Sequence, residues 1–198
     1  IKEQYLLKLA SIYDVREIES FFDVIVEDLL QLNRMEIGWK KNEMLDPLKE
    51  REFTSILEAL TTKQPLQYIL GHAWFYGRSF NVNSSVLIPR PETEELVQWI
   101  IQTSNKNDTL KILDIGTGSG CIPITLKIEL PNASISAIDI SAESLMTATA
   151  NATLYNTAVQ FQQMDILTTN DLSQYHDIIV SNPPYIPEKE KAAMHENV

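Results

Sequence analysis

The sequence predicts an α/β protein in which helices flank a parallel β-sheet and a small helical region precedes the sheet. Three observations support this prediction. Apolar residues recur at helical spacing up to about residue 60, strand-like and helical patterns alternate after residue 108, and a glycine-rich loop separates the first of these strands from the next helix. Such an alternation typically forms parallel strands joined by right-handed crossovers.

The first 60 residues have the pattern of amphipathic helices. A second apolar stripe follows Pro47, a residue that suits the first turn of a helix, and we expect Gly38 and Trp39 in the connection between the two stripes. Such stripes usually form a helical core, and a partner-binding groove is the less common interpretation. The first stripe is Ile18, Phe21, Ile25, Leu29 and Leu32, and the second is Phe53, Ile56, Leu57 and Leu60.

Residues 64–90 change to short aromatic and β-branched pieces, which predict a β-hairpin that bridges two domains. The chain then passes from an extended segment into a helix that we expect to begin at Pro91 and to end near Thr103. Glu92 and Glu94 suit the first turn of this helix, because acidic side chains are favourable near a helix N-terminus.

The alternating region after residue 108 supplies the predicted sheet. Each strand is a short apolar or β-branched run, and each helix has a longer pattern. We expect strands at 111–115, 134–138, 159–163 and 178–181, and helices near 121–129 and 142–155.

Composition and charge exclude several classes of protein. The 198 residues are 44% hydrophobic, but no apolar run approaches the roughly 20 residues that span a bilayer, and residues 1–5 lack the apolar core of a signal peptide. The single cysteine, Cys121, cannot form an internal disulfide, which favours a reducing cytoplasm. The net charge of −11 disfavours nucleic-acid binding and makes a protein partner the better expectation. The three histidines show no ligand spacing, so we expect no metal site.

The glycine-rich loop is the first candidate binding site. It follows a predicted strand and opens a predicted helix, the context that a nucleotide-binding loop requires. Glycines permit the tight turn and a close approach of the backbone to a ligand, and the helix start presents N–H groups to an acceptor. The loop residues are Gly116, Thr117, Gly118, Ser119 and Gly120.

Acidic residues at the strand ends help to choose the cofactor. The spacing is G-x-G-x-G, with Asp114 two residues before it, rather than the G-x-G-x-x-G of dinucleotide-binding loops. This variant favours S-adenosylmethionine, whose ammonium and sulfonium groups suit nearby carboxylates. Asp139 ends the next strand, where it can accept hydrogen bonds from ribose hydroxyls. Asp165 can accept the adenine amino group, or it can equally well be a helix N-cap or a solvated loop acid.

The four residues after the last strand are the second candidate site. An enzyme that alkylates a planar amide or amino nitrogen must hold both of its N–H bonds, and an asparagine oxygen with an adjacent backbone carbonyl can do so. Prolines fix the direction of such carbonyls, and a tyrosine ring can cover a flat group. Taken alone, the same residues fit a proline-stiffened turn with a packing tyrosine equally well. The residues are Asn182, Pro183, Pro184 and Tyr185.

Taken together, the two sites resemble those of Rossmann-like class I methyltransferases that act on exocyclic or amide nitrogen. Two further segments, 65–77 and 87–94, resemble the peptide chain release factor glutamine N5-methyltransferase family in particular. The resemblance covers essentially the whole chain. It implies methyl transfer from S-adenosylmethionine to the glutamine of a Gly-Gly-Gln loop in a bacterial release factor, in the cytoplasm, without direct nucleic-acid or membrane binding.

The resemblance also implies individual roles. The glycine loop would hold the methionine part of the cofactor, Asp139 its ribose, and Asp165 with Ile166 its adenine. Asn182 and the backbone of Pro183 would accept hydrogen bonds from the glutamine amide, and Tyr185 would cover that amide. Asn182 would also border the cofactor, and Pro184 would belong to the substrate site. Arg90 belongs to a family signature, and an ion pair that holds the hairpin is the simplest role for it.

The same resemblance implies a division into a helical substrate-recognition domain (1–62), a hairpin bridge (63–90) and a methyltransferase domain (91–198). Sheets of this class have seven strands, and the chain lacks an initial methionine and continues only briefly past its fourth predicted strand. We therefore expect a fragment with a C-terminally incomplete sheet, and we expect activity from the parent protein rather than from this piece. Alternative activities are methylation of a ribosomal-protein glutamine or of an exocyclic amine in DNA or RNA; a non-catalytic adaptor that binds a nucleotide only for stability is a further alternative.

Overall fold

The computed structural model describes residues 1–32, 34–39, 44–169, 172 and 174–183. The chain divides into two compact units, of which the first is Ile1–Leu70 and the second begins at Gly71. The hairpin therefore groups with the second unit, while the three-part division at residues 62 and 90 stays a prediction.

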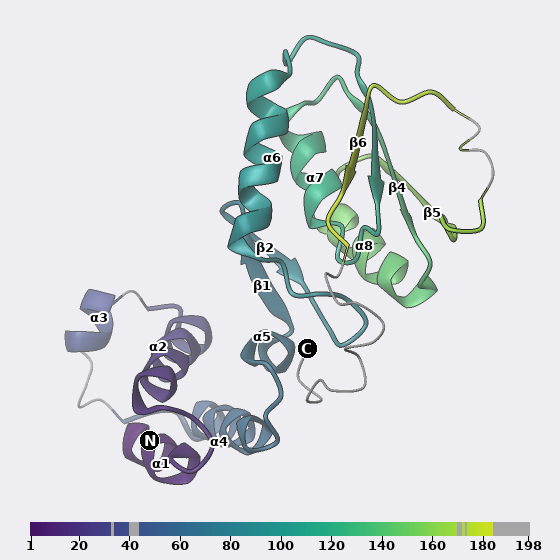
Figure 1. Ribbon diagram of the computed structural model, residues 1–198. Coiled ribbons are helices and arrows are strands. Elements are labelled where there is room, and N and C mark those ends of the chain that lie inside the picture. Colours follow the sequence, from purple (N-terminus) through teal and green to yellow (C-terminus); the bar gives the residue numbers. More distant parts are fainter. Residues whose placement is uncertain (33, 40–43, 170–171, 173, 184–198) are drawn as a thin grey trace. The chain divides into compact units, whose positions relative to one another are not determined.

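The first unit is entirely helical in its described residues (Figure 1). Asp14 and Asp46 cap the two longest helices by accepting hydrogen bonds from the backbone N–H groups of Arg16 and Leu48. The core joins the predicted stripes, and the buried Tyr5 hydroxyl donates to the carbonyl of Phe53 at 2.6 Å. The helices are α1 (Lys2–Leu9), α2 (Val15–Leu30), α3 (Arg34–Trp39), α4 (Pro47–Thr61) and α5 (Leu66–Leu70).

Gly38 and Trp39 lie between the two stripes, as predicted, and they form the end of a short helix, α3, which the sequence did not indicate. Glycine lowers helix propensity without forbidding a helix, and six residues are too few for a clear apolar period. The sequence of α3 therefore predicts a helix only weakly.

The second unit contains a two-stranded hairpin and a four-stranded parallel sheet in the order β5-β4-β3-β6 (Figure 1). Strand β3 pairs on one side with β4 and on the other side with β6, so the strand order reverses at β3. The predicted parallel sheet, the helical N-terminal region and the hairpin are confirmed. The elements are β1 (His72–Phe75), β2 (Arg78–Asn81), α6 (Pro91–Thr103), β3 (Lys111–Ile115), α7 (Cys121–Glu129), β4 (Ser134–Asp139), α8 (Ala142–Leu154), β5 (Val159–Gln163) and β6 (Ile178–Ser181).

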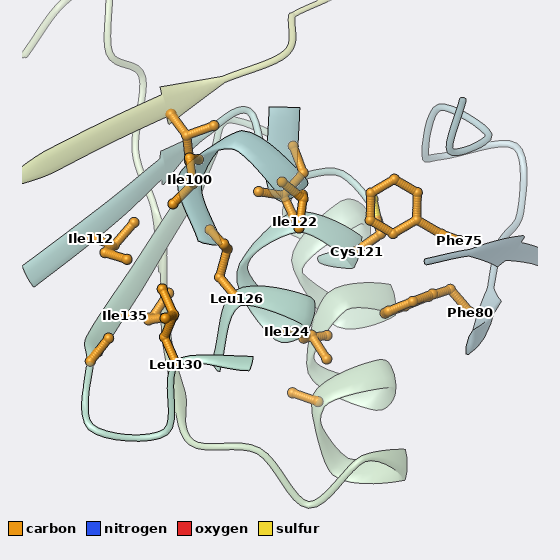
Figure 2. Packing of buried hydrophobic residues seen from close by; sticks show 14 residues of the cluster. Phe75, Phe80, Ile100, Ile112, Cys121, Ile122, Ile124, Leu126, Leu130 and Ile135 are labelled. Atoms are coloured by element: carbon orange, nitrogen blue, oxygen red, sulfur yellow. The ribbon is translucent and has the colours of Figure 1, made fainter. Parts of the chain in front are cut away.

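Helix α7 lies at the centre of the second core. Its residues from Cys121 to Leu126 are all buried, which explains why this segment is apolar on every side. Figure 2 shows Phe75 and Phe80 of the hairpin beside Cys121 and Ile124 of this helix. Burial of the two phenylalanines thus fixes the hairpin to the sheet domain, and each contributes about 2 kcal/mol by removal of its surface from water.

Within the described ranges, none of the helices combines the length and the apolar character needed to cross a bilayer.

Candidate functional site

The two candidate motifs meet where the strand order reverses. Ile115 at the end of β3 pairs with Ser181 at the end of β6, and the Ser181 hydroxyl donates to the Ile115 carbonyl at 2.8 Å. The glycine loop follows Ile115 and Asn182 follows Ser181, so both leave the sheet side by side. Ligands of open α/β sheets bind at this kind of switch point, outside the carboxyl ends of the strands.

The glycine loop has a conformation that depends on its glycines. Gly116, Gly118 and Gly120 have φ values of +74°, +55° and +78°, in the left-handed region that other residues rarely adopt. The neighbouring strand holds the loop, because the amides of Gly116 and Thr117 donate to the Ile138 carbonyl.

Four backbone amides of the loop form hydrogen bonds within the protein. Besides the two that bond to Ile138, the Gly118 amide donates to Asp139 Oδ2 at 2.9 Å and the Gly120 amide donates to the Thr117 carbonyl at 2.9 Å. These four amides therefore have partners within the protein, and the expectation that the helix start presents N–H groups concerns the residues that follow them in α7. The loop is held in a fixed shape by its own hydrogen bonds.

Three carboxylates stand near the ends of adjacent strands. Asp114 lies in β3, Asp139 ends β4, and Asp165 follows β5 by two residues. The carboxylates of Asp139 and Asp165 favour a ligand with cationic groups and disfavour a pyrophosphate.

Each of two carboxylates already has a local partner. Asp139 accepts from Gly118 through Oδ2 and from the Ser141 amide through Oδ1, but a carboxylate has about four acceptor sites, so it retains capacity for ribose hydroxyls. Asp165 Oδ1 accepts the Leu167 amide at 2.9 Å, a capping hydrogen bond in a turn rather than at the helix N-terminus that was one of the alternatives.

Asp114 is fully buried below the loop. Its two oxygens and the Thr117 hydroxyl lack a hydrogen-bond partner in the described part of the chain. Burial raises the pKa of the Asp114 carboxyl to about 7; the adjacent Thr117 hydroxyl lowers this pKa in part, and the charge of Asp139 raises it further. A buried acid without a partner is costly, and a cationic ligand over the loop would reduce that cost. The arrangement therefore fits S-adenosylmethionine.

The raised pKa predicts the pH dependence of stability of the protein without ligand. Folded Asp114 keeps its proton up to about pH 7, whereas the unfolded chain loses it near pH 4, so the stabilising contribution is complete below pH 4 and is lost as the pH rises to 7. The loss is at most about 1.4 kcal/mol per pH unit. Asp114→Asn should flatten this decline in urea unfolding between pH 4 and pH 7. The exposed Asp108→Asn is the matched control, and an equal decline in wild type and Asp114→Asn would contradict the prediction.

Asn182 is oriented by a residue that the sequence analysis did not select. Its Nδ2 donates to the Thr93 hydroxyl at 2.8 Å, and Thr93 is buried in the first turn of α6. The contact with Thr93 therefore uses the Nδ2 atom of Asn182 and not its Oδ1 atom. Thr93 belongs to the segment 87–94 that resembles the family, and this is the one sequence feature that points to it. Its role could not be predicted, because its partner Asn182 is 89 residues away in the sequence.

The Thr93 contact predicts a moderate effect on turnover. Thr93→Val removes the acceptor for Asn182, and we expect kcat to fall about tenfold, or about 1.4 kcal/mol, with little change in cofactor affinity. Thr93→Ser keeps the hydroxyl and should restore kcat in steady-state kinetics. Equal losses in both variants would show that the methyl group matters rather than the hydrogen bond.

The expected role of Arg90 is not met within the described residues. Arg90 is exposed at the N-cap of α6 and forms no ion pair with another described residue. The ion pair that ties the hairpin to the sheet domain is instead Arg78 with Glu129 of α7, at 2.7 Å. The hairpin is also joined to α6, because Glu94 accepts the Tyr76 amide at 2.9 Å.

The remaining predicted residues are placed only in part. Pro183 is exposed and Ile166 is half-buried, whereas Pro184 and Tyr185 lie outside the described residues. In the described part of the chain, no group of three acidic, histidine or cysteine side chains has the geometry of a metal site.

Comparisons with known proteins match two parts of the chain. Residues 93–197 match the model of the Methyltransferase small domain, and residues 8–71 match the PrmC N-terminal domain. A release factor glutamine methyltransferase of Flavobacterium psychrophilum is 49% identical over 100% of this chain and 70% of its own length. Another, from Bacteroides thetaiotaomicron, is 42% identical over 96% of this chain and 68% of its own length.

Proposed function

Because the chain belongs to the release factor glutamine methyltransferase family, we propose that the protein methylates the side-chain amide nitrogen of a glutamine in a peptide chain release factor. The methyl donor is S-adenosylmethionine, and the target is the glutamine of a Gly-Gly-Gln loop. One observation carries the proposal: Asn182 and the glycine loop leave adjacent strands at the point where the strand order reverses.

The residues around the loop would hold the cofactor. Residues 116–120 would wrap its methionine part, Asp139 would accept from its ribose, and Asp165 with Ile166 would border its adenine. Bound S-adenosylmethionine supplies a methyl group on a positively charged sulfur, which departs as a neutral thioether. The row of strand-end carboxylates supports the binding of this cation.

The residues after β6 would hold the acceptor. An amide nitrogen is a poor nucleophile because its lone pair is delocalised, so both N–H bonds need acceptors that keep the nitrogen directed at the methyl group. The side-chain oxygen of Asn182 and the backbone carbonyl of Pro183 would supply these acceptors, with Thr93 fixing the Asn182 amide. The contributions of Pro184 and Tyr185 remain predictions from the motif.

The helical unit would contact the body of the release factor. One surface of α2 carries the exposed Glu19 and Glu27 and the half-buried Asp23 beside Arg16, with Glu19 paired to Lys2. Its excess of acidic groups would be complemented by a basic surface on the partner. Because release factors act on cytoplasmic ribosomes, we propose a cytoplasmic location for the reaction.

The test locates a labelled methyl group. The intact protein is incubated with labelled S-adenosylmethionine and a release factor, a ribosomal-protein fraction or an oligonucleotide, and the product is mapped by mass spectrometry. We expect label on the release factor glutamine and none after Gln→Ala substitution in that loop. Label on a base or on a ribosomal protein instead would overturn the assignment.

A further inference from the structure

Asn151 is a fully buried asparagine whose side chain joins three parts of the second unit. It lies on α8, and its Nδ2 donates to the Asn81 carbonyl at 3.0 Å and to the Ser119 carbonyl at 2.8 Å. Its Oδ1 accepts the Asn81 amide at 2.8 Å. The side chain thus bonds to the last residue of β2 and to the glycine loop at once, with both amide protons in use.

The bonds to Asn81 attach the hairpin to α8. Asn81 directs both of its backbone polar groups to Asn151, and the Tyr155 hydroxyl donates to the carbonyl of Ser79 at 2.6 Å, two residues earlier in β2. Side chains one helical turn apart on α8 therefore cover this edge of the hairpin. Of these two side chains, only Asn151 also bonds to the glycine loop.

Helix α8 approaches the loop at a second point. A Cβ atom on Gly120 would lie 3.0 Å from the Cβ of Ala148, so the loop backbone packs directly against this helix. On the other side of the loop, Asp139 accepts the Gly118 amide. Two side chains thus hold the segment 118–120: Asp139 accepts from the Gly118 amide, and Asn151 donates to the Ser119 carbonyl.

We propose that Asn151 is a positioning residue that holds the Ser119 carbonyl, and with it the glycine loop, in the cofactor-binding conformation before the cofactor arrives. The inference rests on the proposed function only in taking this loop as the S-adenosylmethionine site. Without the bond, the loop samples other conformations, and the apparent Kd rises by the reciprocal of the fraction that remains competent. Loss of the Asn151 bond should therefore weaken cofactor binding and leave the rate of the methyl-transfer step unchanged.

The test compares Asn151→Ala with Tyr155→Phe as matched control. Both variants remove hydrogen bonds between α8 and β2, but only Asn151→Ala removes the bond to the loop. By calorimetry with S-adenosylhomocysteine, we expect Asn151→Ala to raise Kd about tenfold, equivalent to a competent fraction of about one tenth, and Tyr155→Phe to change it less than about twofold. The KM for S-adenosylmethionine should follow Kd, with kcat at saturation nearly unchanged.

Hydrogen exchange of the Gly118 and Gly120 amides provides a measurement that does not depend on the substrate. It should accelerate in Asn151→Ala and not in Tyr155→Phe, even if the wild-type protein proves to methylate something other than a glutamine. If Asn151→Ala does not fold, Asn151→Leu, which keeps a similar volume but has no hydrogen-bond donor, replaces it in both measurements. Unchanged Kd and exchange, or equal changes in the Tyr155→Phe control, would overturn the inference.

Discussion

Replacing Asn182 by alanine should lower kcat by about 10²- to 10³-fold, equivalent to about 2.7–4 kcal/mol, if the side chain supplies one hydrogen bond that strengthens in the transition state. Cofactor affinity should stay within about tenfold, because the glycine loop and Asp139 keep their own hydrogen bonds. The loss should therefore appear in kcat at saturating S-adenosylmethionine. Single-turnover transfer to a release factor measures it directly.

Asn132→Ala is the matched control for this experiment. Asn132 is an exposed asparagine whose Nδ2 donates to the Lys106 carbonyl, and it precedes β4, at the amino ends of the strands and away from the site. Its replacement should leave kcat within about twofold of wild type, as expected for a surface position. If Asn182→Ala behaved like this control, the proposed role of Asn182 in holding the acceptor would be rejected.

Gly120→Ala should destabilise the protein by about 2–5 kcal/mol, the sum of a left-handed backbone cost and a packing cost. Gly120 has a φ of +78°, and an added Cβ would lie 3.0 Å from both Ala148 Cβ and Ile124 Cδ1. The helix α8 and the core of α7 hold these atoms, so the loop must move instead. We also expect cofactor affinity to fall by more than about tenfold, since the moved loop loses its binding shape.

Gly77→Ala separates the two contributions. Gly77 lies in the hairpin turn with a φ of +70°, but no atom lies within 4 Å of the position of an added Cβ. It should therefore cost only about 1–2 kcal/mol in urea unfolding and leave cofactor affinity unchanged. Equal destabilisation by the two substitutions would contradict the steric argument for Gly120.

The elements of the sheet were predictable because their signals are local. Strands β3, β5 and β6 have the predicted bounds, and β4 extends one residue further, to Asp139. Each is a short apolar or β-branched run next to a turn or a helix, so its identity does not depend on distant residues. The glycine loop was equally recognisable, because a turn with repeated positive φ values requires glycine.

The partners of individual polar groups were not predictable, because they depend on residues far away in the sequence. The ion pair of the hairpin involves Arg78 and Glu129, 51 residues apart, and sequence spacing gives no preference for this pair over one that includes Arg90. The amides of the glycine loop have partners in Asp139 and Ile138, which depend on the pairing of β3 with β4. A local pattern shows which groups can form hydrogen bonds, but it does not show which partners they find.

The sequence by itself therefore determined the parallel α/β architecture, the glycine loop, the acidic strand ends and the asparagine motif after the last strand. Only the tertiary structure decided that Asn182 is oriented by Thr93 and that Asn151 joins the hairpin to the glycine loop. The physical reason is that strand order brings residues 32 to 89 positions apart within hydrogen-bond distance. These contacts are directional and short in range, so they exist only once the sheet has fixed the geometry of its neighbours.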